Sequence, residues 1–424
     1  MKIDIAYGRD GLTIDVPEEN LYRVLEPKFV PGLENPHEAL AESLRSPIGS
    51  PPLSRLAKPG TGVTIVVSDK TRPVPSHLIV PPLLENLNSC GVKDEDVRIL
   101  VATGLHRPNT EDELKQMLGE GVVERIEVVN HDARDRDSLV YLGDTRTGTP
   151  IWLNRLLYES EFRILTGYIE PHFFAGYTGG RKAILPGCAG QDTIGKNHGA
   201  DHIGHPKARY GMTDGNPIYE DAVEVAERVG VDFIVNVTLN RDKEITRVFS
   251  GHVFEAHNEG VKFISEKSKV SIPEKVDIAI TNNSGYPLDL NLYQAVKGMT
   301  TPEAVIKDGG EIIMAAECSE GIGHHTFEDM ILESGTPENF LKQISQPGYF
   351  MVDQWQVQVL ARILARARIS LYSENLENDQ IKRMWLNPVK SVEEGIEQAL
   401  ERLGRDASIL VLPDGPETWV ELGR

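Results

Sequence analysis

The chain has 424 residues, of which 40% are hydrophobic, and its 44 Lys and Arg against 64 Asp and Glu give a formal net charge of −20. This length is enough for two or three domains with cores of their own, and the negative charge disfavours nucleic acid and anionic membranes as partners. The three cysteines, Cys90, Cys188 and Cys318, are widely spaced, which suits a reducing cytoplasm. The start of the chain does not resemble a signal peptide, and no run approaches the roughly 18 apolar residues of a membrane span.

The sequence predicts strands and helices that alternate along most of the chain. An N-terminal hairpin is expected over residues 1–16, around the turn GRDG, and a Pro-, Gly- and Ser-rich loop over residues 46–60. Alternating or continuous apolar runs favour strands at residues 63–68, 98–102, 125–130, 163–168, 232–239, 244–249, 276–281, 311–315, 368–372 and 408–412. Helical apolar spacing favours helices at residues 76–90, 111–118, 216–229, 252–268, 291–297, 302–306, 354–367 and 392–403.

This alternation predicts an α/β protein with mostly parallel, doubly wound sheets. The segment KVSIPEK, residues 269–275, is the natural boundary. It divides the chain into an N-terminal domain over residues 1–270 and a C-terminal α/β domain over residues 275–424, whose extreme C-terminus can pack back on the N-terminal domain.

Polar motifs follow four of the predicted strands. They are SDKTRP at residues 68–73, TGLHRP at 103–108, PHFFAGYTGGRKAILPGCAGQDTIGKNH at 171–198 and TNNSG at 281–285. Ligands of parallel α/β sheets bind beyond the carboxyl ends of the strands. The repeated placement of these motifs therefore predicts a binding site there.

The first motif contains three residues suited to an anion. Asp69, Thr71 and Arg72 lie between a strand and a helix, where backbone amides favour anions and an arginine can grip a carboxylate or phosphate with two hydrogen bonds. The alternative is a turn in which Asp69 caps the helix and Arg72 lies in solvent.

Two histidines in these motifs are candidates for acid/base chemistry. His106 lies at a strand end, where an imidazole can act as a general base. His172 precedes two phenylalanines, whose rings can form a dry wall that keeps the imidazole neutral. The alternatives are a structural hydrogen bond for His106 and an aromatic core contact for His172.

Lys182 follows two glycines, which let the backbone come close to a bound group. It can act as a Schiff-base nucleophile, a phosphate clamp or a covalent attachment point for a cofactor, or it can be a surface lysine after a flexible turn.

His198, His202 and His205 have the spacing of one helical face, which suggests a metal site. Gly199 and Gly204 argue against one continuous helix. The sequence therefore favours a single histidine ligand, with the other two peripheral, over a three-histidine zinc site.

Two further segments carry candidate binding residues. Gln294 and Lys297 are three residues apart on a predicted helix and can present a donor and a cation to a carboxylate, or form a solvated pair. Trp355 can line a pocket, although a core position is the more common one for tryptophan.

Taken together, five segments of the chain resemble the nickel-dependent lactate racemase family. They occur in the family's order, and the resemblance covers most of the chain. The segments are SDKTRPVP, ATGLHRP, PHFFAGYTGGRKAILPG, TIxxNH at residues 193–198 and YQAVKG. The resemblance implies two α/β domains with the active site in the cleft between them. It also implies a nickel-pincer nucleotide, a pyridinium mononucleotide with two sulfur-bearing arms that grip nickel, and partner enzymes that make it.

For the cofactor, the resemblance implies that Lys182 forms the covalent link and that His198 is the protein ligand to nickel. Asp69 and Thr71 match positions that help to hold the nucleotide.

For the substrate, the resemblance implies that His106 and His172 are acid/bases on opposite faces. It further implies a set of residues that hold the substrate: Arg72, Lys297, Gln294 and Trp355.

The implied activity is inversion of C2 of lactate or a related 2-hydroxy acid. The C2 hydrogen is poorly acidic because the neighbouring carboxylate is already an anion, so its departure as hydride, with a histidine taking the hydroxyl proton, is the easier route. No residue fixes the substituent on C2, and His202 and His205 have no implied role.

Two rival functions follow from the residues themselves. One is a pyridoxal-phosphate or zinc enzyme that uses Lys182 or the histidines. The other is a non-catalytic protein that binds a nucleotide or sugar acid, against which the pair His106 and His172 argues.

Overall fold

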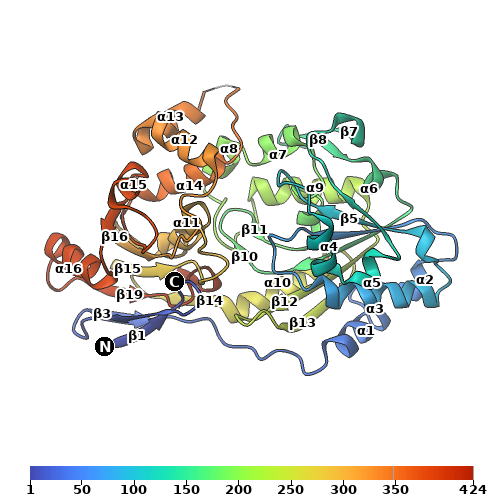
Figure 1. Ribbon diagram of the computed structural model, residues 1–424, viewed down its shortest axis with the longest axis horizontal. Coiled ribbons are helices and arrows are strands. Elements are labelled where there is room, and N and C mark those ends of the chain that lie inside the picture. The colour runs from blue at the N-terminus through green and yellow to red at the C-terminus, as the bar shows by residue number, and fades with distance from the viewer. Residues whose placement is uncertain (347, 424) are drawn as a thin grey trace. The chain divides into compact units, whose positions relative to one another are not determined.

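The computed structural model describes residues 1–346 and 348–423, which form two compact units. Unit 2 contains residues 29–198 and 207–266, and unit 1 contains residues 1–28, 199–206 and 267–424. Figure 1 labels most of the helices and several strands of each sheet. None of the helices in the described residues is long and apolar enough to cross a membrane.

Unit 2 is built on a six-stranded sheet in the order β13-β12-β9-β4-β5-β6, parallel except for β13. Its strands are β4 (Val63–Ser68), β5 (Val97–Ala102), β6 (Glu127–Asn130), β9 (Phe162–Tyr168), β12 (Phe233–Leu239) and β13 (Ile245–Gly251). Its helices are α1 (Pro36–Arg45), α2 (Leu53–Leu56), α3 (Ser76–Ser89), α4 (Glu111–Leu118), α5 (Glu120–Val123), α6 (Arg155–Glu159), α7 (Gln191–Asn197), α9 (Pro217–Val229) and most of α10 (Glu255–Ser268). Two small hairpins complete it: β7 (Leu139–Asp144) with β8 (Pro150–Asn154), and β10 (Pro171–His172) with β11 (Gly176–Tyr177).

Helices cover both faces of this sheet, and the side chains of each strand alternate between the two faces, so both sets of side chains are buried. Ile65 and Val67 of β4 pack with α1, α3 and α4 on one face. Val66 packs with α6, α7 and α9 on the other face. Apolar residues on both faces explain why the strand appears in the sequence as an uninterrupted run, VTIVV.

Unit 1 contains a second six-stranded sheet, all parallel, in the order β18-β17-β16-β15-β19-β3. Its strands are β3 (Leu21–Val24), β15 (Val276–Asn282), β16 (Ile306–Ala315), β17 (Arg368–Tyr372), β18 (Asn387–Val389) and β19 (Ile409–Val411), with the hairpin β1 (Lys2–Ile5) and β2 (Leu12–Asp15) and the pair β14 (Lys269–Ile272) and β20 (Trp419–Leu422). Its helices are α8 (Ala200–Gly204), α11 (Leu292–Thr300), α12 (His325–Ser334), α13 (Pro337–Ile344), α14 (Gln354–Leu364), α15 (Asn378–Arg383) and α16 (Val392–Leu403).

The predicted α/β class with mostly parallel sheets is confirmed, and the N-terminal hairpin forms as expected. The expected N-terminal domain over residues 1–270 needs correction, because residues 1–28 belong to unit 1. There β3 pairs in parallel with β19, and Ile3, Ile5 and Ile14 join the core formed by the sheet and α16. The C-terminal strand β20 pairs with β14 within the same unit.

Candidate functional site

At the centre of the unit 2 sheet, the order in which the chain adds strands changes from one side to the other. Strand β4 lies between β5 and β9, and the chain runs from β4 toward one edge and from β9 toward the other. Such a switch point leaves a crevice beyond the carboxyl ends of the two central strands, where α/β proteins bind ligands. The loop with Asp69, Thr71 and Arg72 follows β4, and the segment with His172 and Lys182 follows β9.

His106 is fixed at this edge by a buried carboxylate. Its Nδ1 lies 2.7 Å from Oδ2 of Asp69, and the hydroxyl of Thr71 donates to the other carboxylate oxygen at 2.8 Å. Burial raises the pKa of Asp69, but the hydrogen bond and charge of His106, with the charge of Arg72, hold it below its ordinary value. An ionised Asp69 keeps the proton of a neutral His106 on Nδ1, so Nε2 can accept a proton.

The loop that carries His106 contacts the segment that carries Lys182. The Gly104 amide donates to the Gly187 carbonyl at 2.9 Å, and the Gly187 amide donates to the Lys182 carbonyl at 3.2 Å. A Cβ on Gly187 would lie 2.8 Å from the Ala102 Cβ, so the close approach requires glycine there. The loops after β5 and β9 are therefore joined through their backbones.

Two glycines fix the turn that precedes Lys182. Gly179 and Gly180 have φ angles of 77° and 51°, and the Gly180 amide donates to Oδ1 of Asn236 on β12 at 2.8 Å. A Cβ on Gly179 would lie 2.8 Å from the same oxygen. The half-buried Lys182 thus follows a turn whose conformation and close contacts both favour glycine.

An aromatic cluster joins His172 to His198. The His172 ring stacks on Phe173 at 4.7 Å and meets the edge of Phe174 at 4.6 Å, and Phe174 meets the His198 ring at 5.2 Å. Nδ1 of His172 accepts from the backbone amides of Phe174 and Ala175 at 3.4 and 3.2 Å. These contacts orient the ring through Nδ1.

The start of helix α9 supports both histidine segments, which the sequence alone did not suggest. Asn216 is fully buried and donates to the Phe174 carbonyl at 2.8 Å. Asp221, 1% exposed, accepts from the side chain of Asn197 at 3.0 Å, immediately before His198. In the sequence, these polar residues among the apolar residues of a helix face were the signal that could have indicated this supporting role.

The three histidines after α7 do not share a helix. His198 ends α7, His202 lies in α8, and His205 ends α8, so the expected break at Gly199 is confirmed. Within residues 1–346 and 348–423, no group of three or more His, Cys, Asp or Glu side chains could hold a metal ion. A donor set of one histidine fits a metal that arrives with other ligands on an organic group, and Lys182 is a suitable attachment point for such a group.

The remaining predicted residues lie in unit 1. Lys297 donates to Oε1 of Gln294 at 2.7 Å, and both side chains are half-buried on α11. Trp355 lies in the first turn of α14 and is also only half-buried. It therefore does not occupy the fully buried core position that is more common for tryptophan.

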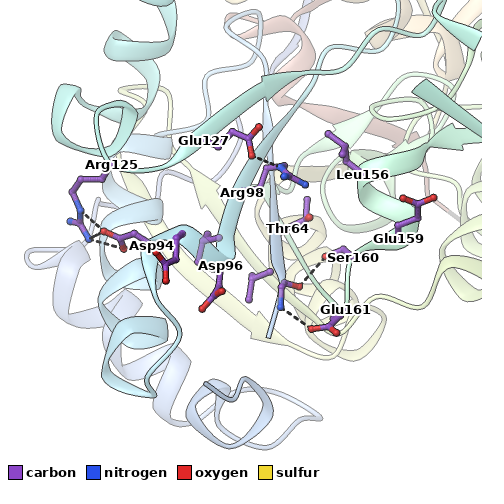
Figure 2. Close-up of a pocket in the computed structure, with 14 residues that line it drawn as sticks. Thr64, Asp94, Asp96, Arg98, Arg125, Glu127, Leu156, Glu159, Ser160 and Glu161 are labelled. Atoms are coloured by element: carbon purple, nitrogen blue, oxygen red, sulfur yellow. Dashed lines mark hydrogen bonds and ion pairs between the residues drawn. The ribbon is translucent and has the colours of Figure 1, made fainter. Parts of the chain in front are cut away.

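A pocket in unit 2 lies at the other edge of the sheet from the candidate site. Figure 2 shows it at the amino ends of β4 and β5, with Arg98 paired to Glu127 and Arg125 paired to Asp94. Its other acidic side chains are Glu95, Asp96, Glu159 and Glu161. It contains none of the predicted site residues, and ligands of parallel sheets bind at the opposite edge.

Comparison with known proteins decides the family. The lactate racemase of Thermoanaerobacterium thermosaccharolyticum is 39% identical over 417 residues, 97% of each chain. That of Lactiplantibacillus plantarum is 41% identical over 421 residues, 97% of this chain and 98% of the relative. The chain belongs to the lactate racemase family. Residues 7–211 match the lactate racemase N-terminal domain and residues 272–420 the C-terminal domain.

One solved structure agrees with this membership in the lactate racemase family, and a second shares the fold. The lactate racemase apoprotein of T. thermosaccharolyticum superposes with a TM-score of 0.94 at 38% identity, covering 99% of this chain and all of that one. A Thermotoga maritima protein with a TM-score of 0.66 and 19% identity, covering 94% of this chain and all of that one, shares the fold. As a member of the racemase family, the protein is an isomerase.

The carboxylate of Asp69 should give this site a pH-dependent stability. Its folded pKa is lowered, so its contribution is fully present above about pH 4 and is lost as the pH falls through the folded pKa. We expect Asp69→Asn to lower the free energy of unfolding by about 1–3 kcal/mol at pH 7, with a difference from wild type that shrinks below about pH 4. Urea unfolding at a series of pH values measures both.

The control is Asp214→Asn, which removes a fully exposed carboxylate of the same unit and should change the unfolding free energy by less than about 0.5 kcal/mol. A loss in Asp69→Asn that stayed constant down to pH 2 would mean that packing, and not charge, is what Asp69 contributes.

Proposed function

We propose that the protein inverts C2 of a 2-hydroxy acid, lactate or a close relative, with a nickel-pincer nucleotide attached to Lys182 and with His106 and His172 as the acid/base pair. The observation that carries this proposal is the gathering of the two histidines, Lys182 and His198 on connected loops at the carboxyl edge of one sheet. The names of the two relatives, both lactate racemases, support lactate as the first substrate to test. We also propose that it acts in the cytoplasm, where its separate free cysteines stay reduced.

The cofactor would be held by two residues that the fold already fixes. Lys182 follows the glycine turn and would carry the covalent link, and His198, which is 6% exposed and lies against Phe174, would supply the one histidine ligand to nickel. When bound, the nickel-pincer nucleotide supplies an acceptor for the C2 hydrogen as hydride. Asp69, expected to help hold the nucleotide, is also bonded to His106, which suits it to a positioning role as well. Enzymes that make the cofactor are the expected partners.

The protein's own residues would carry the proton. Asp69 holds the His106 imidazole so that Nε2 can take the substrate hydroxyl proton as C2 is oxidised to the ketone. After the 2-oxo acid turns its other face, His172 would return a proton to the oxygen from the opposite side, starting as the imidazolium while His106 starts neutral, so the two histidines would exchange protonation states in each turnover. In that charged form Nδ1 carries a proton and no longer accepts from the amides of Phe174 and Ala175. Both histidines are needed because the two enantiomers present their hydroxyl groups to opposite faces.

The substrate carboxylate needs a grip that survives this turn. Arg72 is exposed on the loop after β4 and can form two parallel hydrogen bonds to a carboxylate. Lys297 is held by Gln294 and supplies a second cation, and the half-buried Trp355 offers an apolar surface. Holding one end of the substrate leaves C2 free to present either face.

Intact mass under denaturing conditions tests the covalent cofactor. Wild-type protein co-expressed with the cofactor-making enzymes should gain the mass of the nucleotide, and Lys182→Ala should not. Lys196→Ala is a matched control because Lys196 lies on α7 in the same segment, and it should keep the added mass. No added mass on wild type, under conditions that load a known lactate racemase, would contradict the assignment of Lys182.

Activity of loaded variants tests the two-histidine mechanism. His106→Ala and His172→Ala should each lower kcat/KM about 10²–10⁴-fold, because each removes one proton carrier. The loss should be equal in both directions because lactate enantiomers have equal free energy. His37→Ala removes an exposed histidine of the same unit and should leave the rate unchanged. Full activity in either site variant at equal loading would rule out the mechanism.

A further inference from the structure

Unit 1 also contains a histidine paired with a buried carboxylate, and the proposed reaction does not use this pair. Nδ1 of His324 lies 3.0 Å from Oδ2 of Asp353. Asp353 is 5% exposed, whereas the His324 side chain is 44% exposed. The arrangement is the one seen at His106: a buried carboxylate behind a histidine that faces outward.

Asp353 is fixed by more than this one contact. Its Oδ2 also accepts from the Thr326 hydroxyl at 2.5 Å, and its Oδ1 accepts from the Tyr293 hydroxyl at 2.9 Å. Burial raises the pKa of Asp353, but its hydrogen bonds from His324 and Thr326 hold it below the ordinary value. Its φ of 71° places a non-glycine residue in the left-handed region, a strained conformation that often marks functional sites.

The imidazole of His324 is also held from its face. It stacks on the Tyr293 ring with centroids 4.1 Å apart and planes inclined by 21°. Nδ1 is occupied by Asp353, and Nε2 makes no hydrogen bond to any residue among those described. The exposed nitrogen is therefore both oriented and available to a ligand.

This histidine is attached to the helix that carries the proposed carboxylate-binding residues. The carbonyls of Gly321 and Ile322 accept from the first amides of α11, those of Leu292 and Tyr293, at 3.1 and 3.0 Å. Gly323 packs closely, since a Cβ there would lie 3.1 Å from the Tyr293 Cβ. His324 thus follows a loop bonded to the turn of α11 that precedes Gln294.

Trp355 is tied to the same cluster. It lies two residues after Asp353, and the side chain of Gln356 donates to the Tyr293 carbonyl at 2.6 Å. The three substrate-binding candidates of unit 1 are therefore carried by two helices, α11 and α14, that the hydrogen bond between Tyr293 and Asp353 connects.

We propose that His324 is a specificity-determining residue that hydrogen-bonds an oxygen atom of the group carried on C3 of the 2-hydroxy acid, a hydroxyl or a carboxylate. The proposal rests on the proposed function, because it assigns the substrate's far end to the same site. A methyl group, as in lactate, gives a fixed imidazole nitrogen no partner, whereas a hydroxyl or carboxylate does. Sites with a fixed polar group discriminate strongly by this difference.

The test compares three acids that share the 2-hydroxy carboxylate: lactate, glycerate with a C3 hydroxyl, and malate with a C3 carboxylate. In loaded enzyme, His324→Ala should lower kcat/KM for glycerate or malate about 10- to 100-fold, mainly through KM, and should change that for lactate less than about twofold. Glycerate and malate distinguish a hydroxyl from a carboxylate as the group recognised. His324→Gln, which keeps a hydrogen-bonding side chain, should retain part of the preference.

The control is His325→Ala, which removes the adjacent exposed histidine and should change no substrate's rate. Equal losses for all three acids in both His324 variants would show a structural role, and no loss for any acid would show no role; either overturns the proposal.

Calorimetric binding of the same acids separates this proposal from the proposed function. If wild type bound malate or glycerate tenfold more tightly than His324→Ala but inverted no acid, the racemase proposal would fail and the role of His324 would stand. If the two proteins bound every acid equally, the role of His324 would fail whether or not wild type turned over.

Discussion

Strands β4 and β9 lie side by side in the middle of the unit 2 sheet, although β5 and β6 come between them in the sequence. Because the chain leaves these two strands toward opposite edges, their following loops are not both covered by one crossover helix. Asp69 follows one strand, and His172, Lys182 and His198 follow the other. The loop of His106, after β5, is joined to the Lys182 segment through Gly104 and Gly187.

The same device holds an imidazole in each unit. Asp69 holds His106 in unit 2, and Asp353 holds His324 in unit 1, each through Nδ1 and each with a threonine hydroxyl on the carboxylate. A buried carboxylate is costly unless it is hydrogen-bonded, and here the bonds also fix the ring. His172 is oriented differently, by backbone amides on Nδ1, so the two proposed acid/bases are supported by unlike surroundings.

Much of the fold and of the unit 2 site could be predicted from the sequence because the information is local. Buried strands are continuous apolar runs, helix α4 has the predicted bounds 111–118, and Gly199 breaks the helix after His198. The membership of residues 1–28 in unit 1 could not be predicted, since the pairing of β3 with β19 joins distant segments whose short apolar patterns name no partner. The roles of Asn216, Asp221 and Asp353 also depend on distant contacts.

The central claim is that the C2 hydrogen leaves and returns without exchange with water, while the histidines handle the hydroxyl proton alone. The direct test is to let loaded enzyme interconvert unlabelled L- and D-lactate in ²H₂O and to measure deuterium at C2 of both enantiomers by NMR and mass spectrometry. The account predicts full inversion with protium kept at C2. Deuterium at C2 in step with inversion would contradict it, because it would mean that a base removes the hydrogen as a proton.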